Sequence, residues 1–296
     1  MHRILFLLAF WFAPAFAEVP RVAVDIAPVH GLVARVMDGV GTPDLVVPAG
    51  ASPHHHAMRP SEAQALAGAD VVIWVGHALT PWLEGSIMSL AGDAIQVELM
   101  DVTGVTLLEA REGGVFEGHE HGEDHGMDPH LWLDPDNAAL WLQTIAGVLA
   151  EIDPKNAEKY QENATDGMNE IARVDAETTA SLAPIASRPF IMLHDGFHYF
   201  EAHYDLKAFA SVSASDAEMP GPARLAALRR EVSKAGVSCA ISEPQLDDRL
   251  LKTVTEGLQI KRSTADPIGV EIPLGSAHYP ALLKSVALSF ADCLAP

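Results

Sequence analysis

Short apolar runs alternate with helical segments along this chain, and this alternation restricts its fold more than any other feature. The apolar runs lie at 21–26, 45–47, 70–75 and 95–99, and again at 190–193, 206–210, 237–242 and 259–263. Their length and their β-branched residues are typical of buried strands. Strands that alternate with helices form parallel sheets covered by helices. The sequence therefore predicts an α/β fold.

Prolines and capping residues mark the starts of the helical segments between these runs. We expect helices at 28–37, 61–67 (capped by Ser61), from Pro81 onward, and at 135–152, 222–234, 247–256 and 279–294. The stretch from Pro154 to Ser181 has no strand signal, and its composition predicts one long, largely exposed helix.

This long helix divides the alternation into two halves. We therefore expect two lobes, each a mainly parallel sheet flanked by helices. The N-terminal lobe covers 18–153, the linking helix 154–183 and the C-terminal lobe 184–296. A single helical connection of this kind resists large hinge motion better than paired flexible strands do.

Residues 1–17 have the features of an export signal. Arg3 precedes an apolar run at 4–12, and Ala15-Phe16-Ala17 forms a small-residue cleavage site. The run is too short for a membrane span, which needs roughly 18 apolar residues. We expect a mature chain that starts at Glu18 and, since no cysteine follows directly, carries no lipid anchor. Export to the bacterial periplasm follows.

The formal net charge of −21 argues against nucleic acid as a partner, because phosphate binding needs a basic surface. Cys239 and Cys293 are the two cysteines. In an oxidising compartment such a pair forms a disulfide, and two unpaired buried thiols are the alternative. The bond would close a loop of about 55 residues and add about 4 kcal/mol of stability. Two cysteines are too few for a cysteine zinc site.

The 14 histidines gather in a few segments. Several of these segments lie in loops at the ends of predicted elements: His54, His55 and His56 follow a strand, and His130 precedes a helix. His194 and Asp266 end strand segments. Open α/β sheets place their ligands at such positions. Three imidazoles with a carboxylate or water suit tetrahedral zinc and favour it over manganese. Outside these loops, we interpret His30, His77, His203 and His278 as ordinary surface or core residues.

Four motifs occur in a fixed order. They are GASPHH with RPSE at 50–62, DPHLWLDP at 128–135, LHDGFHYF at 193–200 and STADPIG at 263–269. Over essentially the whole mature chain they resemble the metal-binding solute-binding proteins of ABC importers, the cluster A-I family. The chain looks like the zinc-specific, ZnuA-type subgroup, because the segments around Cys239 and Cys293 resemble those that carry its disulfide. The histidine-rich loop at 117–127 is another mark of that subgroup.

The resemblance implies a ligand for each motif. His54, His130 and His194 match the three histidine ligands, and His194 stands where manganese-binding members carry glutamate. Asp266 matches the carboxylate that completes the site in many members, whereas water or another carboxylate does so in some zinc-binding members. His55 and His56 fall where the family varies, so they are loop residues or alternative ligands.

The segment GHEHGEDHG at 118–126 contains His119, His121 and His125. We interpret it as an accessory loop that collects zinc with low affinity or senses zinc sufficiency. The alternative is an acidic loop with no role in metal binding.

These observations predict a monomeric periplasmic Zn²⁺-binding protein that delivers zinc to an ABC permease and is not an enzyme. A periplasmic metallochaperone is a further candidate partner. The first alternative is a manganese-binding member of the family. The second is a zinc hydrolase. Against it, H-E-x-x-H is missing and no carboxylate is placed as an obvious general base, since nothing in the spacing supports Glu243 or Asp195 in that role. The third is a surface adhesin, which the missing lipid-anchor cysteine disfavours.

Overall fold

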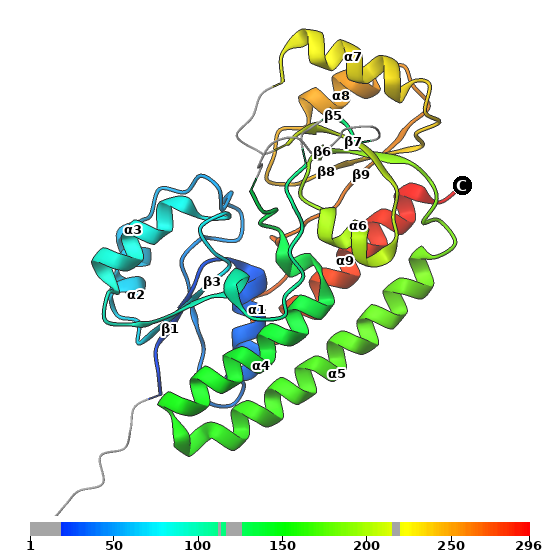
Figure 1. Ribbon diagram of the computed structural model, residues 1–296. Coiled ribbons are helices and arrows are strands. Elements are labelled where there is room, and N and C mark those ends of the chain that lie inside the picture. The colour runs from blue at the N-terminus through cyan, green and yellow to red at the C-terminus, as the bar shows by residue number, and fades with distance from the viewer. Residues whose placement is uncertain (1–18, 112–113, 117–125, 215–219) are drawn as a thin grey trace, which may run out of the picture.

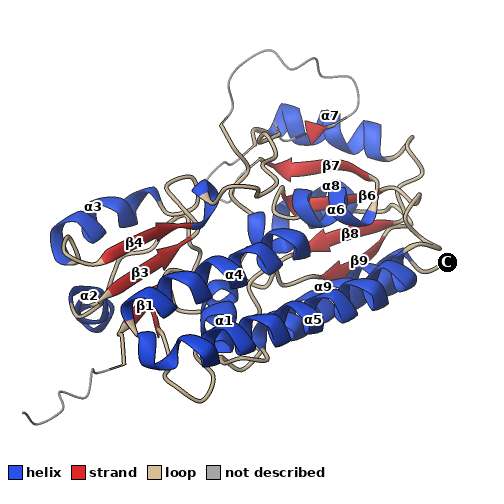
Figure 2. Ribbon diagram, turned by 60° about the horizontal axis from the view of Figure 1, so that its bottom comes forward, coloured by secondary structure: helices blue, strands red, loops and turns tan. Residues whose placement is uncertain are grey.

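The computed structural model describes residues 19–111, 114–116, 126–214 and 220–296, so the predicted export signal lies outside the described part. Two sheets, each flanked by helices, form two lobes side by side (Figures 1 and 2). The predicted α/β fold is confirmed. Within these residues, no helix has the length and apolar character needed to cross a membrane.

The first sheet has four parallel strands in the order β2-β1-β3-β4. Its elements, in chain order, are β1 (Val22–Val24), α1 (Ala27–Val36), β2 (Asp44–Leu45), α2 (Pro60–Ala67), β3 (Val71–Trp74), α3 (Pro81–Leu90), β4 (Ile95–Glu98) and the 3₁₀ helix η1 (Leu99–Asp101). Strands β1 and β3 are completely buried, as their continuous apolar sequences predict.

The N-cap of α2 differs from the prediction by two residues, since it is Arg59 rather than Ser61. The helix itself begins at Pro60. The reason is local: the Glu62 carboxylate accepts the backbone N–H of Arg59 at 2.6 Å, which satisfies a donor ahead of the first turn.

The second sheet has five strands in the order β5-β7-β6-β8-β9. Its elements are β5 (Gly114–Val115), β6 (Phe190–His194), α6 (His198–Tyr204), β7 (Ala208–Ser213), α7 (Pro222–Val232), β8 (Cys239–Ser242), α8 (Arg249–Thr255) and β9 (Lys261–Thr264). Strand β5 is antiparallel to β7, and the other pairs are parallel. Strand β5 escaped prediction because so short a segment shows no usable periodicity. Helix α6 lies between two predicted strands, where the alternation places a helix.

Three helices pack together at the base of the molecule: α4 (Pro135–Ile152), α5 (Ala157–Leu182) and the last helix α9 (His278–Leu294). Helix α5 runs beneath both lobes, whereas α4 lies mainly along the first and α9 along the second (Figure 1). A 3₁₀ helix, η2 (Leu131–Leu133), precedes α4, and another, η3 (Pro154–Asn156), separates α4 from α5. The predicted exposure of α5 is wrong for one face, because Tyr160, Ala164, Ile171 and Val174 form a buried stripe at helical spacing. Helices α4, α1 and α9 contact α5.

One hydrophobic core joins the two lobes. It includes Ile73 from the first sheet, Phe190 and Ile241 from the second, and residues of α1, α4, α5 and α9. The predicted disulfide between Cys239 and Cys293 is present and connects β8 to α9. The shared core holds the two sheets so that the loops at their facing ends can form one site.

Candidate metal centre

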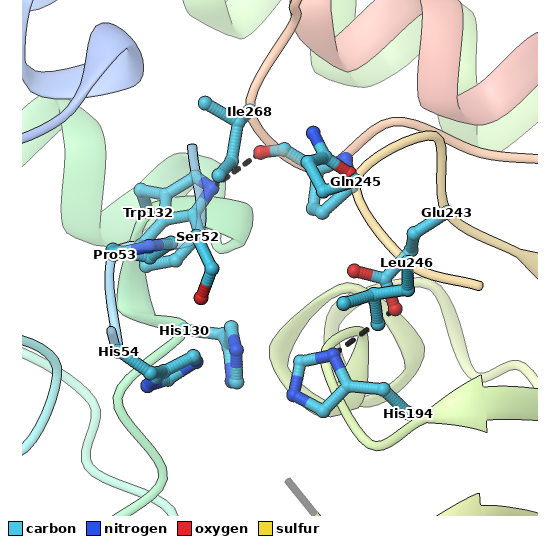
Figure 3. A pocket seen from close by; sticks show the side chains of 11 residues that line it. Ser52, Pro53, His54, His130, Trp132, His194, Glu243, Gln245, Leu246 and Ile268 are labelled. Atoms are coloured by element: carbon cyan, nitrogen blue, oxygen red, sulfur yellow. Dashed lines mark hydrogen bonds and ion pairs between the residues drawn. The ribbon is translucent and has the colours of Figure 1, made fainter. Parts of the chain in front are cut away.

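Three histidines from separate parts of the chain meet between the lobes. His54 lies in the loop after β2, His130 precedes η2 as its N-cap, and His194 ends β6. The candidate ligand atoms on the three imidazole rings all lie within 4.8 Å of one another. His130 and His194 are buried, whereas His54 is partly exposed. Figure 3 shows the three rings facing a common space.

A carboxylate stands behind each of the two buried rings. Asp128 Oδ1 lies 2.8 Å from Nδ1 of His130, and Glu243 Oε1 lies 3.0 Å from Nδ1 of His194. Because a carboxylate accepts hydrogen bonds, these contacts assign the proton to Nδ1 and leave Nε2 with a lone pair. This arrangement orients metal-binding histidines in many proteins.

Neighbouring histidine side chains stabilise the ionised form of Asp128. Burial alone would raise the pKa of this carboxyl, but the electrostatic attraction and hydrogen bonds of the His130 N–H groups, together with His198, hold it well below its ordinary value. Asp128 also accepts the backbone N–H of His130 at 2.9 Å. The carboxylate therefore fixes both the backbone and the ring of His130.

Gly196 has no side chain, and this leaves room for the rings of His194 and His130. A Cβ atom at this position would lie 2.9 Å from Nδ1 and Cε1 of His194 and 3.6 Å from Nε2 of His130. The first of these distances is shorter than real Cβ contacts allow. The absence of a side chain thus lets His194 lie close to His130.

The loop that carries His54 is tied to the N-terminal lobe on both sides of this residue. The Trp82 indole N–H donates to the carbonyl of Pro53 at 2.8 Å, and His56 Nε2 lies 2.7 Å from Glu62 Oε2. His56 is thereby directed toward Trp82, with ring centroids 5.5 Å apart. His55 is exposed. Neither His55 nor His56 belongs to the group of converging ligand atoms.

Asp266 lies at the edge of this arrangement and has other partners. Its Oδ1 accepts hydrogen bonds from the Gln245 side chain and from the backbone N–H groups of Ile268 and Gly269, and its Oδ2 accepts from Val270. These bonds shape the loop after β9, whose Pro267 and Ile268 line the pocket together with Gln245. Asp266 is not in the group of converging ligand atoms.

The two carboxylates considered as hydrolytic bases have structural partners. Glu243 contacts His194, as described above. Asp195 receives the side chain of Arg111, whose Nε donates to Oδ2 at 3.0 Å. Arg111 Nη1 also donates to Glu201 at 2.9 Å, and its guanidinium carbon lies 3.9 Å from the centroid of the Phe116 ring. Both carboxylates therefore have a structural role that the sequence did not reveal.

Several residues that shape the site were not predicted. Asp128 stands two positions before His130 in DPHLWLDP, so its place in the motif was the available signal. Trp82 and Arg111 had no signal, because they reach the site from distant segments. His119, His121 and His125 lie outside the described residues.

Sequence comparisons are consistent with this geometry. A family model described as "Zinc-uptake complex component A periplasmic", ZnuA, matches residues 22–293. The "High-affinity zinc uptake system protein ZnuA" of Paracoccus denitrificans is 38% identical over 95% of this chain and 94% of the relative. The protein of that name from Brucella abortus (strain 2308) is 34% identical over 98% of this chain and 96% of the relative.

The fold also has a counterpart among solved structures. The "Crystal structure of ZnuA" superposes with a TM-score of 0.80 at 21% identity, and the match covers 94% of this chain and all of that one (100%). At this level of identity the likeness concerns the fold.

Proposed function

The chain belongs to the ZnuA family of periplasmic zinc-uptake components, and on this premise we propose that it captures Zn²⁺ in the periplasm and delivers it to an ABC-type permease. In this proposal zinc is the cargo. His54, His130 and His194 bind it, and no catalytic step is involved.

The observation that carries the proposal is the convergence of three imidazoles from both lobes. Three histidines with an open fourth position are a ligand set that zinc uses frequently. Manganese prefers carboxylate and water oxygens, so the same set disfavours the manganese alternative. The carboxylates behind His130 and His194 support the proposal further, because they direct both rings toward the shared space.

We propose water or Asp266 for the fourth position. The Asp266 carboxylate already accepts four hydrogen bonds, and it does not belong to the group of converging ligand atoms. Both observations favour water. Replacement of Asp266 by asparagine should then weaken zinc binding much less than replacement of any of the three histidines.

The remaining proposals concern location and partners. We propose that residues 1–17 are removed on export, so that the periplasmic protein starts at Glu18. It then acts as a monomer with lobes at 18–153 and 184–296 and a linking helix at 154–183, and a periplasmic metallochaperone is a candidate donor of zinc. Sequencing of the N-terminus of the exported protein tests the cleavage site.

The histidine-rich segment has an accessory role in this proposal. His119, His121 and His125 collect zinc weakly and are not needed for the tight site. Serine substitutions at all three positions should remove weak zinc binding and leave one tightly bound ion per chain. Loss of the tight ion in this triple variant would contradict the division of roles.

The decisive experiment is metal content by mass spectrometry. The wild-type protein, offered zinc and manganese together, should retain zinc, and His54→Ala, His130→Ala and His194→Ala should each lose it. His77→Ala is the control, because His77 is exposed and pairs with Glu84. Full zinc retention in all three site variants, or preferential retention of manganese by the wild type, would overturn the proposal.

A further inference from the structure

Helix α6 connects the two sides of the metal centre. It begins four residues after His194 and lies against η2, the 3₁₀ helix that follows His130. At its first turn, the Tyr199 hydroxyl donates to the carbonyl of Asp128 at 3.1 Å. His198 Nδ1 lies 3.3 Å from Asp128 Oδ2. This end of α6 is therefore held beside the residue that orients His130.

The last turn of α6 is held by a histidine outside the metal centre. His203 Nε2 lies 2.9 Å from Asp175 Oδ1 on α5, and its Nδ1 lies 3.3 Å from Asp134 Oδ1. Asp134 is the N-cap of α4, where it accepts the backbone N–H of Asp136 at 2.9 Å. One imidazole thus joins three helices, α4, α5 and α6.

Both ring nitrogens of His203 face carboxylates, and carboxylates accept hydrogen bonds. A ring that donates from both nitrogens is an imidazolium. The His203 side chain is only 16% exposed, so its positive charge is poorly screened by water. The geometry therefore favours a permanent cation at the junction of the three helices.

We propose that His203, as an imidazolium, is a positioning residue of the metal site. It ties the end of α6 to α4 and α5. Because Tyr199 holds the other end of α6 to Asp128, the tie keeps the His194 loop at a set distance from the His130 segment. This inference rests on the proposed zinc-binding function and adds a positioning residue to it.

The charged groups around His203 agree with this assignment. Asp134 and Asp136 face it from α4, and Asp175 faces it from α5. Burial alone would lower the pKa of His203, but the hydrogen bonds and charges of Asp134 and Asp175 raise it to about 9. Tyr204 on α6 and Tyr279 on α9 stay neutral, because burial and nearby carboxylates raise their pKa values.

A divalent cation is the competing occupant of this cluster. His203 Nδ1 and carboxylate oxygens of Asp134 and Asp136 lie within 4.8 Å of one another. A metal would have to displace the proton on Nδ1. The two occupants can be distinguished because Asp136, 3.9 Å from Nδ1 and 83% exposed, matters to a metal but contributes little to the imidazolium.

The test measures zinc affinity by competition with a chromophoric chelator in His203→Gln and His203→Lys, with His77→Gln as control. We expect the glutamine variant, which lacks the charge, to bind zinc about tenfold more weakly. The lysine variant, which keeps the charge, should recover most of the affinity. The visible spectrum of bound Co²⁺ should change in the glutamine variant, since the ligands shift.

Three results would overturn the inference. The first is zinc affinity and a Co²⁺ spectrum equal to wild type in His203→Gln, even if its apo form melts at a lower temperature. The second is an NMR titration in which the His203 ring has an ordinary pKa of about 6.5. The third is a second bound zinc ion that Asp136→Asn removes. Failure of the wild type to bind zinc tightly would instead refute the proposed function itself.

Discussion

Asp128 holds His130 at two points, since its Oδ1 lies 2.8 Å from the ring Nδ1 and 2.9 Å from the backbone nitrogen of the same histidine. The two residues are separated only by Pro129. A carboxylate this close in sequence can fix both the direction of the ring and the tautomer that binds metal. The DPH sequence thus supplies one candidate ligand together with the carboxylate that supports it.

This relationship predicts the effect of Asp128→Asn. The neutral amide can still accept the backbone N–H, but it stabilises the Nδ1 proton less, so His130 is a poorer ligand. We expect zinc affinity to fall about 10- to 100-fold, measured by chelator competition. Asp93→Asn, at an exposed position, should bind zinc as the wild type does. Equal affinities in the two variants would show that Asp128 does not support His130.

The buried ion pairs of Arg111 lead us to expect a large loss of stability when this residue is replaced. It pairs with Asp195 and Glu201, whose side chains are only 3% and 4% exposed. Arg111→Ala leaves both carboxylates buried without their cation, and we expect the free energy of unfolding to fall by about 3–5 kcal/mol in urea denaturation.

The matched control for Arg111 is Arg173→Ala, because Arg173 pairs with Glu177 on the surface of α5, where both side chains are 53% exposed. Water screens such a pair, so stability should hardly change. Similar losses in the two variants would contradict the importance assigned to burial.

The disulfide predicts a second stability effect. Cys239 and Cys293 are 54 positions apart, and the bond between them restricts the unfolded chain. Replacing both with serine should lower the free energy of unfolding by about 4 kcal/mol. One tightly bound zinc per chain should remain, because neither cysteine lines the metal pocket. Loss of zinc from a folded double variant would indicate that the bond also shapes the site.

The raised pKa of His203 leads us to expect that the protein loses stability in alkaline solution. Its pKa is raised to about 9 in the folded chain, compared with about 6.5 unfolded, so the folded state holds the proton more tightly. The resulting stabilisation is fully present below pH 6.5 and disappears as the pH rises through 9. Its upper limit is about 3 kcal/mol. The difference in unfolding free energy between wild type and His203→Gln should therefore shrink between pH 7 and pH 10. A constant difference would contradict the raised pKa.

Much of the fold follows from local patterns. Continuous β-branched runs identify strands that are buried on both faces, and prolines identify the starts of α3 and α4. Strand β5 was not predicted, and the burial of one face of α5 was not anticipated. The pairing of β5 with β7 depends on residues about 95 positions away, and the burial of α5 depends on helices packed against it.

The sequence by itself determined which residue types are available for metal binding and where they stand relative to strand ends. It thereby indicated His54, His130, His194 and Asp266. Only the tertiary structure decided that the three imidazoles converge while Asp266 is held by the backbone of its own loop. The physical reason is that a ligand's partners are set by packing in three dimensions. Arg111, Trp82 and His203 reach their partners across 28 to 90 positions of sequence, a relationship that no local pattern records.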